Sequence, residues 1–170
     1  SLYPNQIKQV IPFIQKHQIK KVIFISSTSV YNESNSVVTE RDALNPEKAS
    51  GKALLKAENI LLNNKGFKTT VIRFGGLIGE DRNPARFLLG KKEGMSGKKP
   101  VNLIHLEDCI AILNQIIQSN IWGEVFNACC PEHPTRKEFY SKASEVSGLP
   151  CPTLTDADTS YKLVNSDKLI

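Results

Sequence analysis

The sequence predicts an α/β fold whose core is a parallel sheet. Two short runs rich in β-branched residues, 20–25 and 69–74, have the composition of buried strands. Each follows a segment with apolar residues at helical spacing, 4–18 and 49–63. Strands that alternate with helices of about 10–15 residues are typical of parallel sheets. The chain of 170 residues suits one domain, and the shorter elements in its second half are expected to form a cap.

The first half of the chain supplies a helix–strand–helix–strand unit. Pro12 lies inside the first helical segment, where it is expected to kink the helix or mark a restart. Residues 32–48 are polar and are expected to form a loop. The helix over 49–63 has one apolar face, which includes Leu54. That pattern offers a simple packing role for Leu54.

Shorter elements follow the strand over 69–74. Asp108 lies near a helix start, where the helix dipole favours negative charge. Thr135 and Glu138 have the spacing of a capping box. In order, we expect a glycine-rich turn at 75–79, a helix at 84–90, a strand at 100–104, a helix at 106–118, a strand at 125–127, a helix ending at Gly148 and an irregular tail from Pro150.

The composition is ordinary for a globular protein, with 40% apolar residues. No apolar run approaches the roughly 20 residues of a membrane span, so we expect no membrane association. The cysteines form no Cys-x-x-Cys pair, which argues against a zinc site or a thioredoxin-like motif. We interpret them as reduced, buried thiols of a cytoplasmic protein. They are Cys109, Cys129, Cys130 and Cys151.

Much of the net charge of +5 lies in one basic stretch, 82–99, which has Glu93 as its one acid. Such a cluster could bind the phosphates of a nucleotide sugar or of nucleic acid, or it could be a solvated lysine-rich loop. Phe87 is its one aromatic residue, so base stacking has little support and nucleic-acid binding is the weakest alternative. The basic residues are Arg82, Arg86, Lys91, Lys92, Lys98 and Lys99.

A Ser26-Ser27-Thr28-Ser29 turn follows the first strand. Open α/β sheets bind ligands at the carboxyl ends of their strands, so these hydroxyls are candidates for ligand contact. The alternative is a serine-rich turn whose side chains cap their own backbone.

Four segments together resemble the extended short-chain dehydrogenase/reductase family of NAD-dependent epimerases and dehydratases. They are Ser26–Tyr31, Ala57-Glu58, Arg73–Gly79 and Asn102–Asp108. The resemblance covers most of the chain and implies the C-terminal portion of such a protein. It implies a Rossmann-type parallel sheet with helices on both faces, plus a small α/β substrate-binding cap. Residues 1–75 would be the second half of an NAD(P)-binding domain, and 76–170 would be mainly cap, with some segments returning to the core.

The resemblance also implies a set of site residues. Ser27 and Thr28 would orient the reacting group of the substrate and count as the catalytic candidates. The cofactor, NAD or NADP, would be contacted by Ser26, Tyr31, Arg73 and Gly75. A small-molecule substrate, of the nucleotide-sugar kind, would be contacted by Gly76, Arg86 and Asn102. Guanidinium suits bidentate phosphate binding, which supports Arg86.

His105 and Asp108 lie three residues apart at a helix start. No third or fourth ligand is in sight, so we expect no metal. The expected roles are structural, with Asp108 capping its helix and His105 bonding nearby backbone.

The family's Tyr-x-x-x-Lys pair is not in this sequence. When the segments are aligned on Ala57-Glu58, Ser50 holds the Tyr position and Leu54 holds the Lys position. A phenol has a pKa of about 10, and a lysine one helical turn away lowers it toward the pH at which proton transfer is efficient. A serine with no adjacent base cannot replace that pair. The resemblance is therefore closest to atypical members that keep the fold and lose the tyrosine.

Two functions are consistent with these observations. The first is an NAD(P)-binding, nucleotide-sugar epimerase- or dehydratase-like protein. The second is a non-enzymatic dinucleotide-binding regulatory protein. The chain begins Ser-Leu-Tyr-Pro, and read with the resemblance it is expected to be a fragment of a longer protein. The Gly-x-Gly-x-x-Gly turn that holds a dinucleotide is not in this sequence. In a fragment that turn would lie upstream of Ser1, whereas a complete chain without it would bind a dinucleotide poorly. The strand at 20–25 of a fragment would lie at an open sheet edge, and the isolated chain is expected to be dimeric, swapped or poorly soluble.

Overall fold

A computed structural model describes residues 2–87, 94–151 and 153–169. Its central sheet has three parallel strands in the order β1-β3-β7. The strands are β1 (Lys21–Ser27), β3 (Lys68–Phe74) and β7 (Val125–Ala128). Their carboxyl ends therefore meet at one edge of the sheet, as expected for an α/β fold. Ser26, Arg73 and Asn127 form one row across the sheet near that edge.

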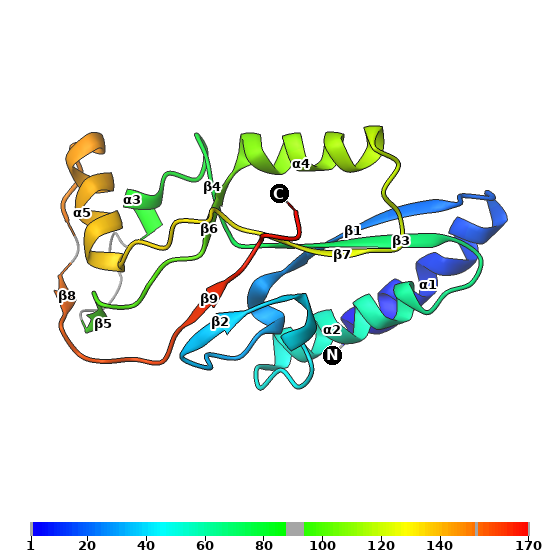
Figure 1. Cartoon of the computed structure of the whole chain (residues 1–170), viewed down its shortest axis with the longest axis horizontal. Helices are drawn as coiled ribbons and strands as arrows, with labels where there is room; N and C mark the ends of the chain where they lie inside the picture. The colour runs from blue at the N-terminus through cyan, green and yellow to red at the C-terminus, as the bar shows by residue number, and fades with distance from the viewer. Residues whose placement is uncertain (1, 88–93, 152, 170) are drawn as a thin grey trace.

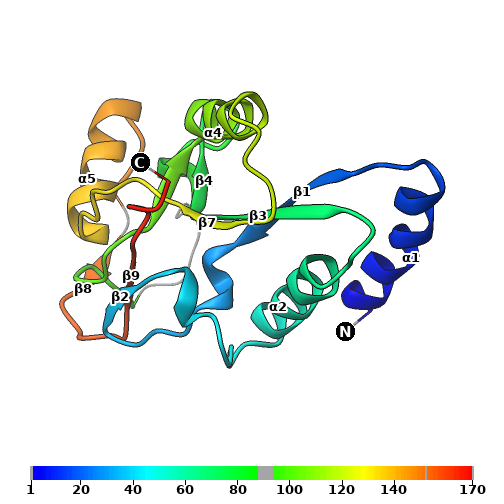
Figure 2. The same cartoon turned by 45° about the vertical axis from the view of Figure 1, so that its right-hand side comes forward.

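Helices cover both faces of the central sheet (Figures 1 and 2). Helices α1 (Tyr3–Lys16) and α2 (Ala49–Leu62) pack together on one face, and α4 (Leu106–Gln118) lies on the other. Side chains alternate along each strand, so Val71 packs toward α1 and α2 while Ile72 packs toward α4. This arrangement confirms the predicted fold class.

The remaining elements lie at the end of the molecule where the central strands finish (Figure 1). Helices α3 and α5 pack against each other there, and Val101 and Tyr140 form a small separate core. The strands pair in parallel as β2 with β9, β4 with β6 and β5 with β8. The bounds are β2 (Ser36–Val38), β4 (Gly76–Ile78), α3 (Pro84–Phe87), β5 (Met95–Ser96), β6 (Leu103–His105), α5 (Arg136–Ser147), β8 (Leu154–Thr155) and β9 (Lys162–Val164), with the 3-10 turns η1 (Thr28–Val30) and η2 (Glu40–Asp42).

Three sequence-based expectations about short elements are wrong. The polar stretch 32–48 contains β2, the glycine-rich turn contains β4, and the tail from Pro150 contains β8 and β9. Each of these strands has two or three residues and pairs with a partner far away in the sequence. A local pattern cannot reveal such a strand, because the stabilising hydrogen bonds come from tertiary contact. The strand expected at 100–104 is β6, which begins three residues later.

Helix boundaries agree more closely with the prediction. Helix α1 continues through Pro12 without a restart, and α4 has the expected bounds. The expected helix 84–90 is described as far as Phe87, and its remainder lies outside the described residues. The capping box of Thr135 and Glu138 is confirmed, and α5 ends at Ser147 with Gly148 as its C-cap, in the left-handed conformation with a φ of 67°.

The cap of α4 differs from the expectation. His105 is the N-cap residue, and its Nδ1 accepts a hydrogen bond from the Glu107 backbone N–H at 3.3 Å. Asp108 instead lies in the first turn, where its charge still suits the helix dipole. The prediction that Asp108 caps the helix is wrong because histidine, an uncommon N-cap residue, takes that position.

Strand β1 forms one edge of the central sheet, and within the described chain β3 is its only neighbour in that sheet. Ile25 on this strand is 47% exposed, which is high for an isoleucine in a strand of this kind. An open edge of this type favours further pairing. Association of the isolated chain stays a prediction.

Gly51 provides a sharp test of how α2 docks on the turn after β1. A β-carbon at this position would lie 2.5 Å from the Ser29 backbone oxygen and 3.0 Å from the Pro46 side chain. We predict that Gly51→Ala lowers the free energy of unfolding by about 1–3 kcal/mol, because neither neighbour can move freely. The matched control is Ser50→Ala, at an exposed position of the same helix, which should change stability by less than about 0.5 kcal/mol. Urea unfolding of both variants measures this, and equal stability of the two would contradict the close contact.

Candidate functional site

The turn after β1 brings the predicted hydroxyl residues to the carboxyl edge of the sheet. Ser27 is the N-cap of η1, and its Oγ accepts a hydrogen bond from the Ser29 backbone N–H at 3.1 Å. Ser27 therefore caps its own turn, as the structural alternative anticipated. A hydroxyl can accept twice and donate once, so this bond leaves the Ser27 proton for another partner. Thr28 is buried beside it.

Beneath this turn, Arg73 and Glu58 form an ion pair that is almost completely buried. Arg73 lies on β3 and is 4% exposed, while Glu58 lies on α2 and is 0% exposed. The Arg73 Nη2 donates to Glu58 Oε2 at 2.6 Å, and Nε donates to both carboxylate oxygens at 3.1 and 3.2 Å. The Ser26 hydroxyl donates to Glu58 Oε1 at 2.5 Å. The carboxylate is thus satisfied from two neighbouring strands.

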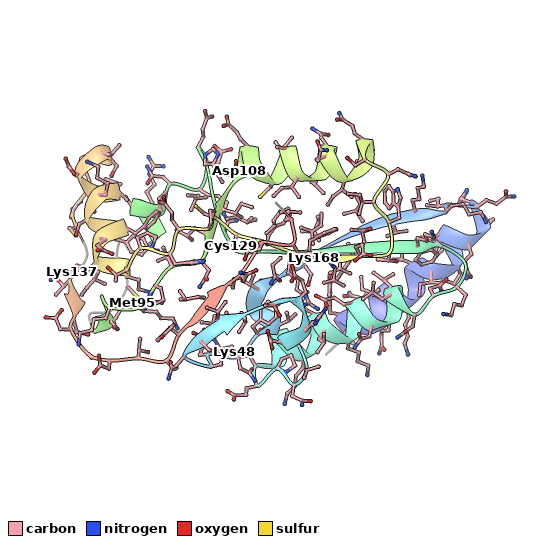
Figure 3. The ribbon with its side chains drawn as sticks, viewed as in Figure 1. Lys48, Met95, Asp108, Cys129, Lys137 and Lys168 are labelled. Atoms are coloured by element: carbon pink, nitrogen blue, oxygen red, sulfur yellow. The ribbon has the colours of Figure 1, made fainter. Side chains whose placement is uncertain are left out.

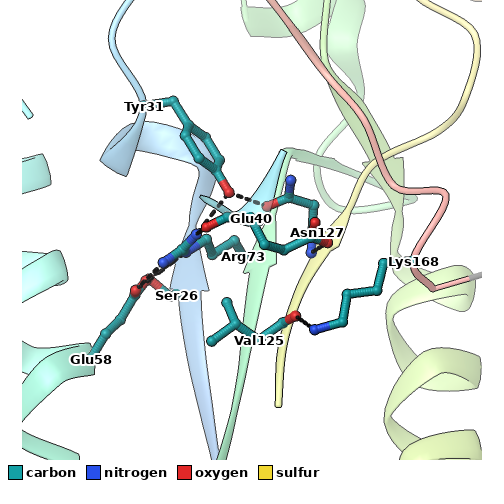
Figure 4. Close-up of polar contacts among 8 residues, drawn as sticks. All are labelled: Ser26, Tyr31, Glu40, Glu58, Arg73, Val125, Asn127 and Lys168. Atoms are coloured by element: carbon teal, nitrogen blue, oxygen red, sulfur yellow. Dashed lines mark hydrogen bonds and ion pairs between the residues drawn. The ribbon is translucent and has the colours of Figure 1, made fainter. Parts of the chain in front are cut away.

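The same guanidinium extends the network to the third strand (Figure 4). Arg73 Nη1 donates to the Tyr31 hydroxyl at 2.8 Å and to the Glu40 backbone oxygen at 2.9 Å. The Tyr31 hydroxyl in turn donates to Asn127 Oδ1 at 2.5 Å. The Asn127 backbone N–H donates to the Glu40 carboxylate at 2.8 Å. One buried cluster therefore ties together all three central strands, α2 and the two 3-10 turns.

The electrostatics of the cluster fix its protonation at neutral pH. Burial alone would lower the pKa of the Arg73 guanidinium, but the Glu58 carboxylate and the Tyr31 hydroxyl raise it above its ordinary value. Burial raises the pKa of the Tyr31 phenol above its ordinary value, although Arg73 acts in the opposite direction. Arg73 is therefore charged and Tyr31 is neutral. The Tyr31 hydroxyl can then donate to Asn127 while it accepts from Arg73.

This placement gives internal partners to three residues that the resemblance assigns to the cofactor. Ser26, Tyr31 and Arg73 all bond to other side chains of the cluster. Their common role in the structure is to hold the strand ends and the turn above them. A direct cofactor contact by any of them stays a prediction.

Gly75, Gly76 and Asn102 meet at the junction between the sheet and the cap. A β-carbon on Gly75 would lie 2.8 Å from the Asn102 backbone oxygen, and one on Gly76 would lie 2.7 Å from the Leu103 side chain. The Asn102 amide donates to the Lys162 backbone oxygen at 3.0 Å and accepts from the Val164 N–H at 2.8 Å. These contacts account for the residue types of Gly75 and Asn102, whereas at Gly76 the nearest atom is the end of a flexible leucine side chain. Their predicted roles in cofactor and substrate binding are untested.

The basic stretch is divided among separate partners. Lys98 pairs with Asp158 at 2.9 Å, and Lys99 pairs with Glu33 at 2.8 Å. Arg86 is exposed on α3, and Lys91 and Lys92 lie outside the described residues. The two ion pairs use acids from distant parts of the sequence, so the stretch is less one-sided in space than in sequence.

Glu33 is the centre of a second charged group close to the turn. Lys162 lies 3.7 Å from its carboxylate and donates to the Tyr31 backbone oxygen at 2.8 Å. Burial alone would raise the pKa of Glu33, but Lys99, Lys162 and Lys48 lower it below its ordinary value. Burial and the nearby Lys48 and Lys99 lower the pKa of Lys162. The group carries more positive than negative charge beside the Ser27–Thr28 turn.

Two hollows of about 340 and 250 Å³ open near the end of β7. Both are lined by Ile104, Asp108 and Cys130. Figure 3 shows Asp108 at the start of α4 and Cys129 beneath it. Burial raises the pKa of the Cys129 thiol to about 12, so this thiol is inert at neutral pH. The exposed Cys130 is the accessible thiol of the pair.

The structure corrects the interpretation of the cysteines as uniformly buried. Cys109 and Cys129 are buried, whereas Cys130 and Cys151 are exposed, and all four are free thiols. Among the described residues, no three His, Cys, Asp or Glu side chains come together as metal ligands would. Within the same part of the chain, no helix is long and apolar enough to cross a membrane.

Sequence reasoning missed the roles of Glu58, Asn127 and Glu40. A signal for Glu58 exists, because it sits on the apolar face of α2 beside Ala57 and Leu61. An acid at such a position predicts a buried partner. No comparable signal marks Asn127 or Glu40, since they bond to each other across 87 positions of sequence and Asn127 bonds to Tyr31 across 96.

Comparison with known proteins identifies one curated relative in two strains. No family model matches the chain. The chain is 35% identical over 160 residues to protein YeeZ of Escherichia coli K12, and the alignment covers 94% of this chain and 58% of YeeZ. The chain therefore spans a little more than half the length of that relative.

Solved structures show the fold more broadly. A conserved protein of unknown function from Silicibacter pomeroyi superposes with a TM-score of 0.81 at 24% identity, over 96% of this chain and 64% of that one. UDP-glucuronic acid 4-epimerase from Bacillus cereus in complex with NAD superposes with a TM-score of 0.79 at 20% identity. The superposition covers 96% of this chain and 58% of the epimerase chain. The chain has the Rossmann-like fold of the epimerase and dehydrogenase/reductase proteins. At these identities the likeness establishes the fold alone.

The buried ion pair gives the most direct test of the site's construction. We predict that Glu58→Gln lowers the free energy of unfolding by about 3–5 kcal/mol, because Arg73 is left as an uncompensated buried charge. The double variant Glu58→Leu/Arg73→Met should lose less than Glu58→Gln, because it removes both charges. Urea unfolding of the parent, the single variant and the double variant measures their free energies of unfolding.

The exposed pair of Lys142 and Glu145, 2.9 Å apart on α5, is the matched control for this experiment. Glu145→Gln should change stability by less than about 1 kcal/mol. A similar small change for Glu58→Gln would mean that the buried pair does not hold the carboxyl edge together.

Proposed function

We propose that the protein carrying this chain binds NAD or NADP and acts as a nucleotide-sugar epimerase- or dehydratase-like protein. The observation that supports this most is the hydroxyl turn of Ser27 and Thr28, held at the carboxyl edge of a parallel sheet. Open α/β sheets bind their ligands at this edge. The fold is shared with an epimerase solved in complex with NAD, which makes a nicotinamide cofactor the leading candidate.

The residues present fit one part of such a cofactor site. The turn offers hydroxyl groups at the strand ends, where a nicotinamide and a sugar hydroxyl would meet. The Gly-x-Gly-x-x-Gly turn that cradles a pyrophosphate is not in this sequence, so the proposal concerns the protein as a whole. In this division, residues 1–75 supply the cofactor side and 76–170 mainly supply the substrate side. The cofactor itself would accept and return a hydride.

The roles proposed for this chain's residues are orientation and charge. Ser27 or Thr28 orients the reacting hydroxyl or carbonyl group of the substrate. The Arg73–Glu58 cluster keeps the turn in place from below. Arg86, exposed on α3, and the lysines around Glu33 supply positive charge for the substrate's phosphates. The proton acceptor has to be a group other than the usual pair, because Ser50 and Leu54 occupy those positions.

The second candidate is a dinucleotide-binding protein that performs no turnover. One observation favours it specifically, namely the position of Leu54. This side chain packs against two apolar clusters, on the inner face of α2, so the usual lysine position is used for packing. Such a protein would bind NAD(P)H and leave it unchanged when nucleotide sugars are offered.

The test is a titration of the protein that carries this chain, including any sequence that precedes it. NADH and NADPH are added while nicotinamide fluorescence is followed, and saturable binding is expected. UDP-sugars and NAD are then supplied together, and product formation is measured. Turnover supports the enzyme, binding without turnover supports the regulator, and no binding contradicts both.

If turnover is found, the hydroxyl turn can be tested by substitution. We predict that Thr28→Val or Ser27→Ala lowers kcat by about a hundredfold, because the substrate loses an orienting hydrogen bond. The matched control is Thr159→Val in the exposed C-terminal segment, which should leave kcat unchanged. Equal kcat values for the two turn variants and the control would show that the hydroxyl turn takes no part in catalysis.

A further inference from the structure

A separate hollow of about 560 Å³ lies at the opposite edge of the central sheet, where the strands begin. It opens between the start of β1, the loop from α2 into β3 and the turn before β7. This edge lies away from the Ser27–Thr28 turn, so the hollow does not belong to the site described above. The lining residues are Lys20, Lys21, Leu62, Asn64, Lys65, Gly66, Phe67, Lys68, Thr69, Asn120, Trp122 and Gly123.

The charge of this hollow is one-sided. Among the described residues that line it, four are lysines and none is Asp or Glu. All four lysines are exposed, two at the start of β1 and two where the loop from α2 enters β3. Like charges gathered around one concave surface repel each other, and the concave shape focuses their field on an anion that enters. The first requirement on a ligand is therefore a negative charge, and a phosphate fits it best.

The hollow also contains the one tryptophan of the chain, and neighbouring groups hold it in place. The Trp122 indole Nε1 donates to Asn120 Oδ1 at 2.9 Å. Lys21 donates to the same oxygen at 2.5 Å, and its ammonium lies 5.3 Å from the centre of the Trp122 ring. A fixed, half-buried indole at the edge of a basic hollow is a surface on which a flat aromatic group can stack. The second requirement on a ligand is therefore a planar ring.

We propose that this hollow binds a nucleoside phosphate, with the phosphate on Lys20, Lys65 and Lys68 and the base against Trp122. The volume is in the range of small-ligand pockets, roughly 300–1,000 Å³. Asn64 and Asn120 also line the hollow. Their side-chain oxygens already accept from the Gly66 N–H and from Lys21 and Trp122, so their amide N–H groups are the ones offered to the sugar or the base edge. The proposal is independent of the function proposed for the carboxyl edge.

Because Trp122 is the only tryptophan, its fluorescence reports on this hollow alone. The experiment titrates the chain with AMP and GMP at low salt and follows tryptophan emission. We expect saturable quenching at ligand concentrations below roughly 1 mM, weakened by added salt because exposed charges are screened. Adenosine and inorganic phosphate, each of which has one of the two required features, should bind at least about tenfold more weakly.

Charge-reversal variants distinguish AMP binding in this hollow from non-specific attraction of AMP to the positively charged protein. Lys65→Glu/Lys68→Glu should weaken AMP binding by at least about tenfold, since both residues are exposed and the fold should be kept. The control for the charge change is Lys137→Glu together with Lys142→Glu on α5, at the far end of the molecule (Figure 3). The control variant should bind AMP as the parent does. Circular dichroism confirms that each variant is folded.

Several results would overturn the proposal. These are no saturable quenching, equal weakening by the two charge-reversal pairs, or tight binding of a single-stranded oligonucleotide that AMP does not displace. Thr28→Val and Ser27→Ala should leave AMP quenching unchanged. Loss of AMP binding in those variants would assign the signal to the carboxyl edge and contradict a separate site.

Discussion

The buried ion pair of Arg73 and Glu58 is the interaction on which the carboxyl edge depends. Removing two charges from water is expensive, and the expense is offset only when geometry and further hydrogen bonds are good. Here the guanidinium uses all three nitrogens, and the carboxylate also accepts from Ser26. The pair therefore fixes the relative position of α2, β1 and β3. The turn that carries Ser27 and Thr28 stands directly on this cluster.

The same face of the sheet changes character along its length. At the amino-terminal part it carries Phe24 and Val71, which pack on α1 and α2. Two residues further along, the inward positions are Ser26 and Arg73, with Asn127 completing the row. An apolar layer thus passes into a polar layer at the edge where a ligand would bind. This arrangement gives the hydroxyl turn a rigid base, although the turn itself is short.

The sequence pattern predicts the parts of this fold that local physics determines. Apolar periodicity predicts the helices α2 and α4, and β-branched composition predicts the strands β1 and β3. The Thr135 capping box follows from residue type and spacing. The short strands β2 and β9 do not, because each has three residues and exists only through its distant partner. The sequence predicts only part of the buried polar cluster. Glu58 on an apolar helix face signals a buried partner, but nothing local identifies that partner as Arg73.

The two candidate sites differ in what holds them. At the carboxyl edge a buried network of Arg73, Glu58 and Ser26 supports a hydroxyl turn. At the amino-terminal edge an exposed group of lysines surrounds one indole. The first is built on a buried ion pair, whereas the second is open and lined by positive charge. We therefore expect the two edges of the sheet to bind different chemical groups, a substrate hydroxyl or carbonyl at the carboxyl edge and a nucleoside phosphate at the other.

Amide hydrogen exchange across residues 26–31 tests most directly whether the buried cluster supports the turn. In the parent chain the Ser29 and Tyr31 amides, which bond to Ser27 Oγ and to the Thr28 backbone oxygen, should be protected. In Glu58→Gln these amides should exchange faster while those of α4 keep their protection, because α4 packs on the other face. Unchanged protection of the turn in a folded Glu58→Gln variant would contradict the account.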